Sequence, residues 1–404
     1  MTTSIPSSLI WTPRFKLPAP HLYIVVGAAT LGSLFFLRSI SRPSKSDRLQ
    51  TIPSPNENVL AKLTAEQLES LPYPPVALPG ARDVDSPYGS TRVYEWGPED
   101  GEPILLIHGI STPSIALTDL ADKLVERGCR VMLFDLFGRG YSSAPSPERH
   151  RYDSALYTSQ ILLCLQSSPI PWLSFTIIGY SLGGAIAADF TSYFPYLVRG
   201  LVLVAPGGLI RTTHVSWKSK ILYQSGGWLP EWVVRKMVAR RLWTGPPANK
   251  SIEPEPDMVE NAETTTTSST GNAVYLSSNH TLLPGNPHST VSAVVDWQIT
   301  HHKGFVPAFI SSIRHAPVHN QHHRWRVIKE NIDQGMGELS EVWLVLGETD
   351  PIIVAQELME DVRGVLGKEN VKIKIVKGAG HEVAIERADD IVDVVGCVLG
   401  ENGW

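Results

Sequence analysis

One pentapeptide constrains the fold of this chain more than any other feature: Gly179-Tyr180-Ser181-Leu182-Gly183, directly after the apolar run 175–178. A serine with a glycine two residues away on each side, between a β-rich run and a helical pattern, is typical of a nucleophile elbow. The sharp turn leaves little room around the serine backbone, and the two glycines supply that room. The small residues 184–188 predict a thin helix whose positive N-terminal end lies beneath Ser181. The pentapeptide therefore predicts a strand, a strained turn and a helix.

Other apolar runs of four to six residues recur along the chain, each followed by Gly, Asp or Pro and then by a helical pattern. Such runs are typical of parallel strands that are buried on both faces of a sheet. In sheets of this kind, ligands bind at the carboxyl ends of the strands. Ser181, Asp350 and His381 each follow one of these runs. We therefore expect the three side chains to converge at one edge of the sheet.

Four further stretches together resemble the α/β-hydrolase superfamily, from about residue 90 to the end of the chain. They are His108-Gly109-Ile110 after the run 104–107, the D-x-x-G-x-G-x-S sequence 135–142, Glu348-Thr349-Asp350-Pro351 after 342–347, and Gly378-Ala379-Gly380-His381 after 371–376. The order Ser, Asp, His along the chain is also that of the family. The resemblance implies an α/β fold with a mostly parallel central sheet, helices on both faces and a helical cap inserted after the sixth strand.

The resemblance also implies acyl transfer through a covalent intermediate. Ser181 would be the nucleophile, His381 the base, and Asp350 the acid that orients the imidazole, with Glu348 as the reserve acid. No cofactor and no metal are implied. The serine at 181 excludes the epoxide-hydrolase and haloalkane-dehalogenase branches of the family, which would require aspartate there.

A second group of residues would support this chemistry through the backbone. The resemblance implies an oxyanion hole made of the N–H groups of Ile110 and Leu182. His108 and Gly109 belong to the same loop motif as Ile110, and Gly179 and Gly183 make room for the turn.

The N-terminal part of the chain predicts a membrane anchor. Residues 17–37 are nearly uncharged, and about twenty such residues span the hydrocarbon of a bilayer. A cleaved signal peptide and a buried helix are the alternatives, but the stretch is long for a signal peptide and ends without small cleavage-site residues. We favour a permanent single-pass anchor in the endoplasmic reticulum or another internal membrane.

Two observations bear on the side of the membrane. Four basic residues at positions 38–48 outnumber the two at 14 and 16, so the positive-inside rule places the following domain in the cytosol. Asn249 and Asn279 begin glycosylation acceptor sequences that would matter only in a lumen. Because both lie in a Ser/Thr-rich segment where the pattern arises easily, we give the charges more weight.

We expect the following organisation. It comprises an N-terminal tail (1–16), a transmembrane anchor (17–40), a Pro- and Ser-rich tether (41–88), the α/β-hydrolase core (89–206 and 301–404), and a cap (207–300) with a disordered insertion (246–287).

Five of the eleven tryptophans, at positions 217, 228, 232, 243 and 297, fall in the predicted cap. They indicate an aromatic roof over an apolar, acyl-type pocket, or a hydrophobic contact between cap and core. The stretch 231–243 is amphipathic and basic. A solvated cap helix is favoured there over a helix lying on an anionic bilayer.

Composition removes several other classes. The net charge of −5 gives no basic footprint for nucleic acid. Three scattered cysteines, Cys129, Cys164 and Cys397, form no disulfide framework. The histidines at 315, 319, 322 and 323 invite a metal site, but Pro317 interrupts their helix and no acidic or cysteine ligand is interleaved, so we expect no metal.

Three functions remain open. The first is a membrane-anchored serine hydrolase that cleaves ester, thioester or amide bonds of apolar substrates, similar to monoacylglycerol lipases and carboxylesterases. The second is a biosynthetic enzyme that uses the same triad for product release, condensation or carbon–carbon cleavage, as in some fungal relatives. The third, a ligand-binding protein without catalysis, is disfavoured by the intact triad. Substrate identity depends on the shape of the cap and cannot be read from the triad.

Overall fold

The central element of the structure, a computed structural model, is an eight-stranded sheet with the order β10-β9-β8-β7-β4-β5-β3-β2. The structure describes residues 50–211, 219, 222–224, 229–244 and 279–400. These residues all belong to one compact unit, Leu49–Trp404. The strands of the sheet are β2 Arg82–Val84, β3 Thr91–Trp96, β4 Glu102–Ile107, β5 Cys129–Phe134, β7 Phe175–Tyr180, β8 Val198–Val204, β9 Val342–Gly347 and β10 Val371–Val376.

The sheet is mostly parallel, as predicted. All pairs from β10 to β5 are parallel, and only the β5–β3 and β3–β2 pairs are antiparallel. Every residue of β5 and of β7 is buried, which is why the runs 131–134 and 175–178 within them do not show the alternating pattern of a half-exposed strand. β8 is the sixth strand of the sheet in chain order, and the cap helices follow it.

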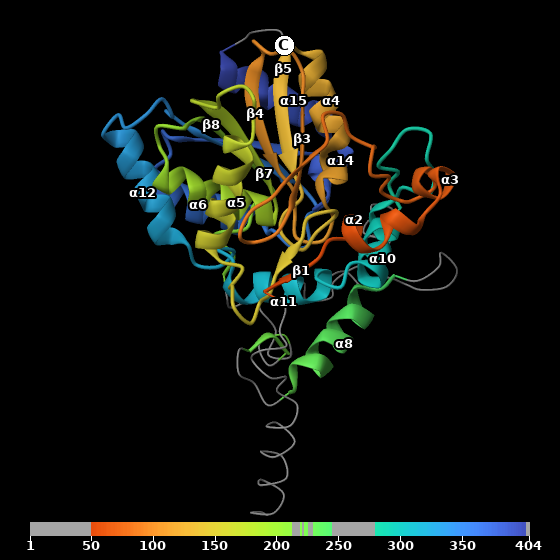
Figure 1. Cartoon of the computed structure of the whole chain (residues 1–404). Helices are drawn as coiled ribbons and strands as arrows, with labels where there is room; N and C mark the ends of the chain where they lie inside the picture. Colours follow the sequence, from red (N-terminus) through yellow and green to blue (C-terminus); the bar gives the residue numbers. More distant parts are fainter. Residues whose placement is uncertain (1–49, 212–218, 220–221, 225–228, 245–278, 401–404) are drawn as a thin grey trace, which may run out of the picture. The chain divides into compact units, whose positions relative to one another are not determined.

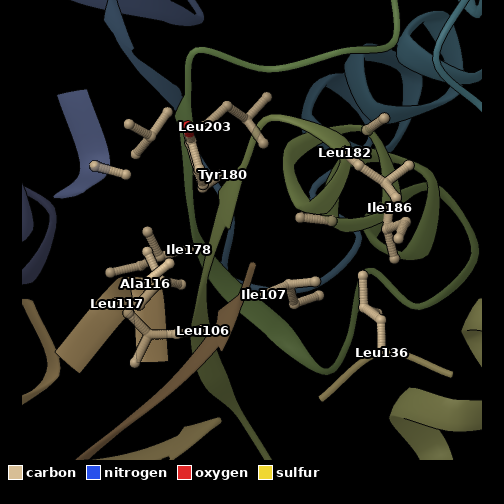
Figure 2. Packing of buried hydrophobic residues seen from close by; sticks show 14 of the residues in the cluster. Leu106, Ile107, Ala116, Leu117, Leu136, Ile178, Tyr180, Leu182, Ile186 and Leu203 are labelled. Carbon is tan, nitrogen blue, oxygen red and sulfur yellow. The ribbon is translucent and has the colours of Figure 1, made fainter. Parts of the chain in front are cut away.

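Helices cover both faces of the sheet (Figure 1). On one face lie α5 Ser154–Gln166, α6 Leu182–Tyr193 and α12 His322–Asp333, with α13 Ala355–Leu366 next to α12 and β10. On the other face lie α4 Thr118–Glu126, α14 Val383–Glu386 and α15 Ala388–Leu399, with the short helix η2 Ser114–Leu117. Figure 2 shows the two sides of β4: Leu106 lies toward Leu117, and Ile107 lies toward Leu136.

The segment from residue 50 to 88 packs on this core and is not a tether. Its elements are β1 Thr51–Ile52, α2 Pro55–Asn58, η1 Leu60–Lys62, α3 Ala65–Glu69 and β2. β1 pairs with β6 Ala144–Pro145, β2 joins the main sheet, and Tyr73 is fully buried. The prediction of a tether is therefore wrong for residues 50–88, because single buried side chains between prolines leave no periodic pattern. Residues 41–49 lie outside the described residues.

The cap contains α8 Glu231–Leu242, α10 Val291–His301 and α11 Phe305–His315. Because α11 packs on α8 and α10, the cap continues beyond the predicted boundary at residue 300. Of the predicted disordered insertion, residues 246–278, with Asn249, lie outside the described residues. Its last nine residues, 279–287, pack on the segment 50–88: Leu282 is buried, and the Asn286 side chain donates to the Leu71 carbonyl over 3.1 Å. Disorder is therefore the wrong prediction for these nine.

The predicted tail and anchor, residues 1–16 and 17–40, lie outside the described residues. In the described part of the chain, no helix has both the length and the apolar character needed to cross a membrane.

Candidate active site

Ser181 lies on a strained turn between β7 and α6. Its φ of 54° and ψ of −114° fall in a region that non-glycine residues rarely adopt. A side-chain carbon at position 183 would lie 2.1 Å from the Ile107 carbonyl oxygen, and one at position 179 would lie 2.3 Å from that of Gly183. Both positions must therefore be glycine, as the motif predicted, because backbone atoms occupy the space on either side of the serine.

The side chains of Ser181, His381 and Asp350 form one hydrogen-bonded series. His381 Nε2 lies 3.0 Å from Ser181 Oγ, and His381 Nδ1 lies 2.9 Å from Asp350 Oδ2. An ionised carboxylate only accepts hydrogen bonds, so the imidazole proton belongs on Nδ1 and the Nε2 lone pair faces the serine hydroxyl. Loops after three different strands, β7, β9 and β10, thus bring together the three residues that the sequence singled out.

Asp350 is held in place by the loop that carries it. Its second oxygen, Oδ1, accepts the N–H groups of Ile352 over 2.8 Å and Ile353 over 2.9 Å, and its side chain is only 1% exposed. Glu348, the reserve acid, has a different partner: its Oε2 accepts the Gly378 N–H over 2.9 Å. His381 is therefore hydrogen-bonded to Asp350 and not to Glu348. Glu348 instead stabilises the turn that contains Gly378 and leads to His381.

The loop after β4 runs beside the nucleophile. A side-chain carbon at Gly109 would lie 3.5 Å from Ser181 Cβ, an ordinary contact distance, and 3.2 Å from the Tyr180 ring, so the loop passes within van der Waals reach of the serine. Leu182 is the first residue of α6, and N–H groups in the first turn of a helix have no partner within that helix. The Leu182 N–H thus lies in the first turn directly after the serine, and the loop that carries Ile110 runs beside it, where the sequence predicted an oxyanion hole.

His108 fixes the peptide group whose N–H belongs to Ile110. Its Nε2 accepts the Leu136 N–H over 2.9 Å, so the ring proton lies on Nδ1 and is donated to the Gly109 carbonyl over 2.7 Å. The carbonyl of Gly109 and the N–H of Ile110 belong to one planar unit, so this hydrogen bond sets the direction of the N–H. Burial lowers the pKa of His108 to about 3, which keeps the ring neutral.

Two buried side chains that the sequence did not single out brace the same loop. Arg139 is fully buried and donates to the Ile110 carbonyl over 3.1 Å and to Ser312 Oγ of α11 over 2.8 Å. Gln298 of α10 donates to the Ser111 carbonyl over 2.9 Å and accepts the Gly140 N–H over 2.8 Å. The only local signal was the arginine between two glycines in the 135–142 turn. The cap therefore shares hydrogen bonds with the loops of the site.

The described cap tryptophans do not form the predicted roof. Trp232 and Trp243 are 63% and 39% exposed, whereas Trp297 is buried and lies edge-on to Tyr141 with 5.9 Å between ring centroids. Trp297 thus packs the cap on the core, which was the alternative interpretation. Trp217 and Trp228 lie outside the described residues.

A small cavity lies against the loop that follows the acid, and none of the three triad side chains lines it. Its apolar walls come from the segment after β8, including Leu209 and Ile210, and from Ile352 and Ile353, which follow Asp350. Arg211 and Asp361 also line it, and they are joined by two hydrogen bonds of 2.9 Å. Among the residues that the structure describes, no cluster of His, Cys, Asp or Glu could hold a metal ion, the histidines of 315–323 included.

Comparison with known proteins agrees with this architecture. The sequence model of the alpha/beta hydrolase family matches residues 104–394, which is most of the chain. The chain belongs to the α/β hydrolase family. The segment 50–103, with β1, β2, β3 and Tyr73, precedes the part of this α/β hydrolase that the family model matches.

Individual relatives match over shorter lengths. A serine hydrolase-like protein of Danio rerio is 31% identical over 126 residues, which cover 31% of this chain and 37% of the relative. The chain thus spans about a third of the length of the curated relatives that it matches. Among solved structures, one from a crystallographic study of carboxylesterases of Nitrososphaera gargenis superposes with a TM-score of 0.51 at 15% sequence identity. The match covers 79% of this α/β hydrolase and 98% of the other chain. The structure of a bacterial membrane phospholipase A superposes with a TM-score of 0.52 at 16% sequence identity, and the match covers 94% of this chain and 96% of the phospholipase chain. At these low sequence identities, the likeness of this chain to the two structures concerns the fold alone.

Proposed function

We propose that the protein is a membrane-anchored serine hydrolase that cleaves ester, thioester or amide bonds of apolar substrates through an acyl-enzyme on Ser181. The observation that carries the proposal is the series of hydrogen bonds from Asp350 through His381 to Ser181, with lengths of 2.9 and 3.0 Å. Membership of the α/β hydrolase family and the similarity to serine hydrolase-like proteins support the same reaction type.

In this mechanism, His381 Nε2 removes the proton from Ser181 as Oγ attacks the substrate carbonyl carbon. The negative charge moves to the carbonyl oxygen, where the N–H groups of Ile110 and Leu182 stabilise it. As the bond to the leaving group breaks, His381 returns its proton to the departing atom. Water then attacks the acyl-enzyme in the same way and releases the acid. Asp350 stabilises the imidazolium that forms in each half-reaction.

Apolar substrates are proposed from the walls of the cavity that lies against the loop after Asp350. The cavity walls include four apolar side chains, those of Leu209, Ile210, Ile352 and Ile353. Binding of an acyl or alkyl group against them would remove apolar surface of both the substrate and the protein from water. Carbon–carbon cleavage and condensation would use the same triad, and no observation in the described residues favours them over hydrolysis.

Anchoring is proposed from residues 17–40, because the nearly uncharged stretch 17–37 within them is long enough to span a bilayer. We place the anchor in the endoplasmic reticulum or another internal membrane, with the catalytic domain on the cytosolic side, because basic residues are more numerous after the apolar stretch than before it. Asn249 and Asn279 would then remain unmodified.

Covalent labelling with a fluorophosphonate probe tests the catalytic proposal. The probe phosphonylates an activated serine with loss of fluoride, so it should label the wild-type protein and fail to label Ser181→Ala. Ser192→Ala is the matched control, because Ser192 is a buried serine near the end of α6, the helix that Ser181 precedes, and its hydroxyl donates to the Asp189 carbonyl. Labelling that persists in Ser181→Ala would refute the assignment, and a protein that is never labelled would favour the non-catalytic alternative.

A further inference from the structure

The outer face of the cap carries an unusual cluster of exposed apolar side chains. Leu229, Trp232, Met237 and Trp243 are 39%, 63%, 49% and 39% exposed and lie on or next to α8. They are four of the eleven exposed large hydrophobic residues in the part of the chain that the structure describes. Single exposed apolar residues are ordinary, but four of them within the fifteen residues 229–243 mark a segment that can meet a partner.

The helix shows a different face to the rest of the cap. Val234 and Val238 are buried, and α8 contacts α10 and α11. With 100° between successive residues, Trp232, Lys236 and Arg240 lie on the side of the helix opposite these two valines. A hydrogen-bonded ion pair of 3.0 Å between Glu231 and Arg314 of α11 fixes the first turn. In Figure 1, α8 lies beyond α11 on the side away from the sheet.

The charges on this face complement an anionic surface. Lys236 and Arg240 are exposed on the same side of the helix as Trp232, and the single acidic residue of α8, Glu231, is bound by Arg314. The helix is therefore locally basic in a chain whose net charge is −5. Tryptophan beside lysine and arginine is the composition of helices that lie in the headgroup region of a bilayer.

We propose that α8 and Leu229 form a docking surface for a bilayer that contains anionic lipid. The four apolar side chains enter the interface, and the basic side chains bind lipid phosphate groups. The exposure of Trp232 and Met237 thus reverses the preference for a solvated helix that the sequence alone favoured. This contact is separate from the N-terminal anchor and turns the cap side of the domain toward the membrane.

A fluorescent label on α8 of the full-length protein tests the proposal independently of the anchor. Cys397 is the exposed cysteine, and Cys129 and Cys164 are buried, so Cys397→Ser gives a background for single labelling sites. An environment-sensitive NBD label is attached at Met237→Cys. The matched control is Leu173→Cys, because Leu173 is 78% exposed and precedes β7, at the opposite end of the sheet from the cap. Both proteins are reconstituted into vesicles of phosphatidylcholine with 30 mole per cent phosphatidylserine or without it.

In anionic vesicles, we expect a blue shift of the emission at position 237 and quenching by lipids with brominated acyl chains. Neither effect should occur at position 173. The double variant Lys236→Glu/Arg240→Glu should lose both effects, whereas Lys236→Arg/Arg240→Lys should keep them, since it conserves charge.

Three results would overturn the proposal. The first is equal emission at positions 237 and 173 in anionic vesicles. The second is an equal blue shift in neutral vesicles, which would remove the requirement for anionic lipid. The third is a blue shift of the label at 237 together with self-association in detergent without vesicles, which would identify a second copy of the chain as the occupant. Fluorophosphonate labelling of Ser181 is measured in the same samples, so failure of docking is distinguished from failure of the catalytic proposal.

Discussion

At the scale of single residues, the two acids near the end of β9 have separate partners. Asp350 Oδ2 bonds His381, and Glu348 Oε2 bonds the Gly378 N–H. We predict that Asp350→Asn lowers kcat by about 10⁴, because an amide can donate a hydrogen bond to Nδ1 and so favours the wrong tautomer. Glu348→Gln keeps an acceptor for Gly378 and should leave kcat within about threefold of wild type. Steady-state hydrolysis of an activated ester measures both, and a larger loss in the glutamine variant would reassign the acid.

His108 and His302 are both buried and can make all their hydrogen bonds only while neutral. His302 Nδ1 accepts the Gly304 N–H over 3.1 Å, so its Nε2 donates to the Ser142 carbonyl over 2.9 Å. Burial lowers the pKa of His108 to about 3 and that of His302 to about 4. In the unfolded chain the pKa of each is about 6.5. Between these values the unfolded state binds more protons, so stability rises with pH and is lost as the pH falls below about 6.5.

We predict that the free energy of unfolding decreases by on the order of 3 kcal/mol per histidine between pH 7 and pH 4. Urea unfolding at a series of pH values measures the decrease. In His302→Gln the amide can donate to the Ser142 carbonyl and accept the Gly304 N–H without titrating. Only His108 then contributes to the pH dependence, so the decrease in the free energy of unfolding should be about half of that expected from both histidines. A variant whose pH dependence matches that of the wild type would contradict the role of His302.

At the scale of elements, the closest approach in the site is that of the β4 loop to the first turn of α6. A methyl group at position 183 would meet the carbonyl oxygens of Ile107 at 2.1 Å and of His108 at 2.7 Å. We predict that Gly183→Ala lowers the free energy of unfolding by about 1–3 kcal/mol, because packed backbone must move. Displacement of the loop that carries the Ile110 N–H should also lower kcat on the order of 10²-fold.

Gly364 on α13 gives the matched control for this substitution. No atom lies within 4 Å of the carbon that Gly364→Ala would add. Alanine should stabilise that helix by about 0.5–1 kcal/mol and leave kcat unchanged. Thermal unfolding and ester hydrolysis of both variants check the pair. If Gly183→Ala behaves like Gly364→Ala, the close approach is not what requires glycine at the elbow.

The same elements show what a sequence can predict. Strands β5 and β7, buried on both faces, leave runs without the alternation of a half-exposed strand, and Ser181 is recognised because its motif is contiguous. β1 has two residues and β2 has three, none of them fully buried, so neither leaves a pattern. The hydrogen bonds from Arg139 to Ser312 and from Gly140 to Gln298 join positions 173 and 158 residues apart. No local pattern carries information over such distances, so the bracing of the Ile110 loop becomes visible only in the fold.

At the scale of the whole molecule, the segment 50–88 supplies part of the interior. The Tyr73 hydroxyl lies 2.7 Å from the Tyr94 hydroxyl and 3.2 Å from Asp135 Oδ1, and all three side chains are buried. Asp135 also accepts the Ser114 and Tyr141 N–H groups, and burial raises its pKa. Loss of Tyr73 would leave a buried carboxylate with fewer donors, which is costly.

We predict different results from two truncations. Removal of residues 1–49 should make the protein extractable from membranes by alkaline carbonate and preserve labelling of Ser181, because the predicted anchor is lost while the packed segment and α8 remain. Removal of residues 1–88 should abolish folding, since β1, β2 and Tyr73 are lost. Alkaline carbonate extraction, thermal unfolding and probe labelling measure these outcomes.

Two results would contradict these truncation predictions. If the protein without residues 1–49 stays in the carbonate-resistant fraction, the anchor does not lie in residues 17–40. If the protein without residues 1–88 remains folded, the segment is dispensable. The point variant Tyr73→Phe, expected to lose about 1–3 kcal/mol, separates the contribution of the hydroxyl from that of the whole segment.

The buried Arg139 has a consequence for engineering and for the divergence of such enzymes. Its guanidinium joins the Ile110 carbonyl in the core to Ser312 in α11, and Gln298 of α10 joins Ser111 to Gly140. A chimaera that received the cap of another family member without a glutamine and a serine at these two positions would leave the Gly140 N–H and one donor of the buried guanidinium, Nη2, without acceptors. The cap of this protein therefore cannot be replaced by the cap of another family member without loss of these hydrogen bonds. Exchanges of substrate specificity by cap transplantation must carry α10 and α11 together with the Asp135–Ser142 turn as one inherited unit.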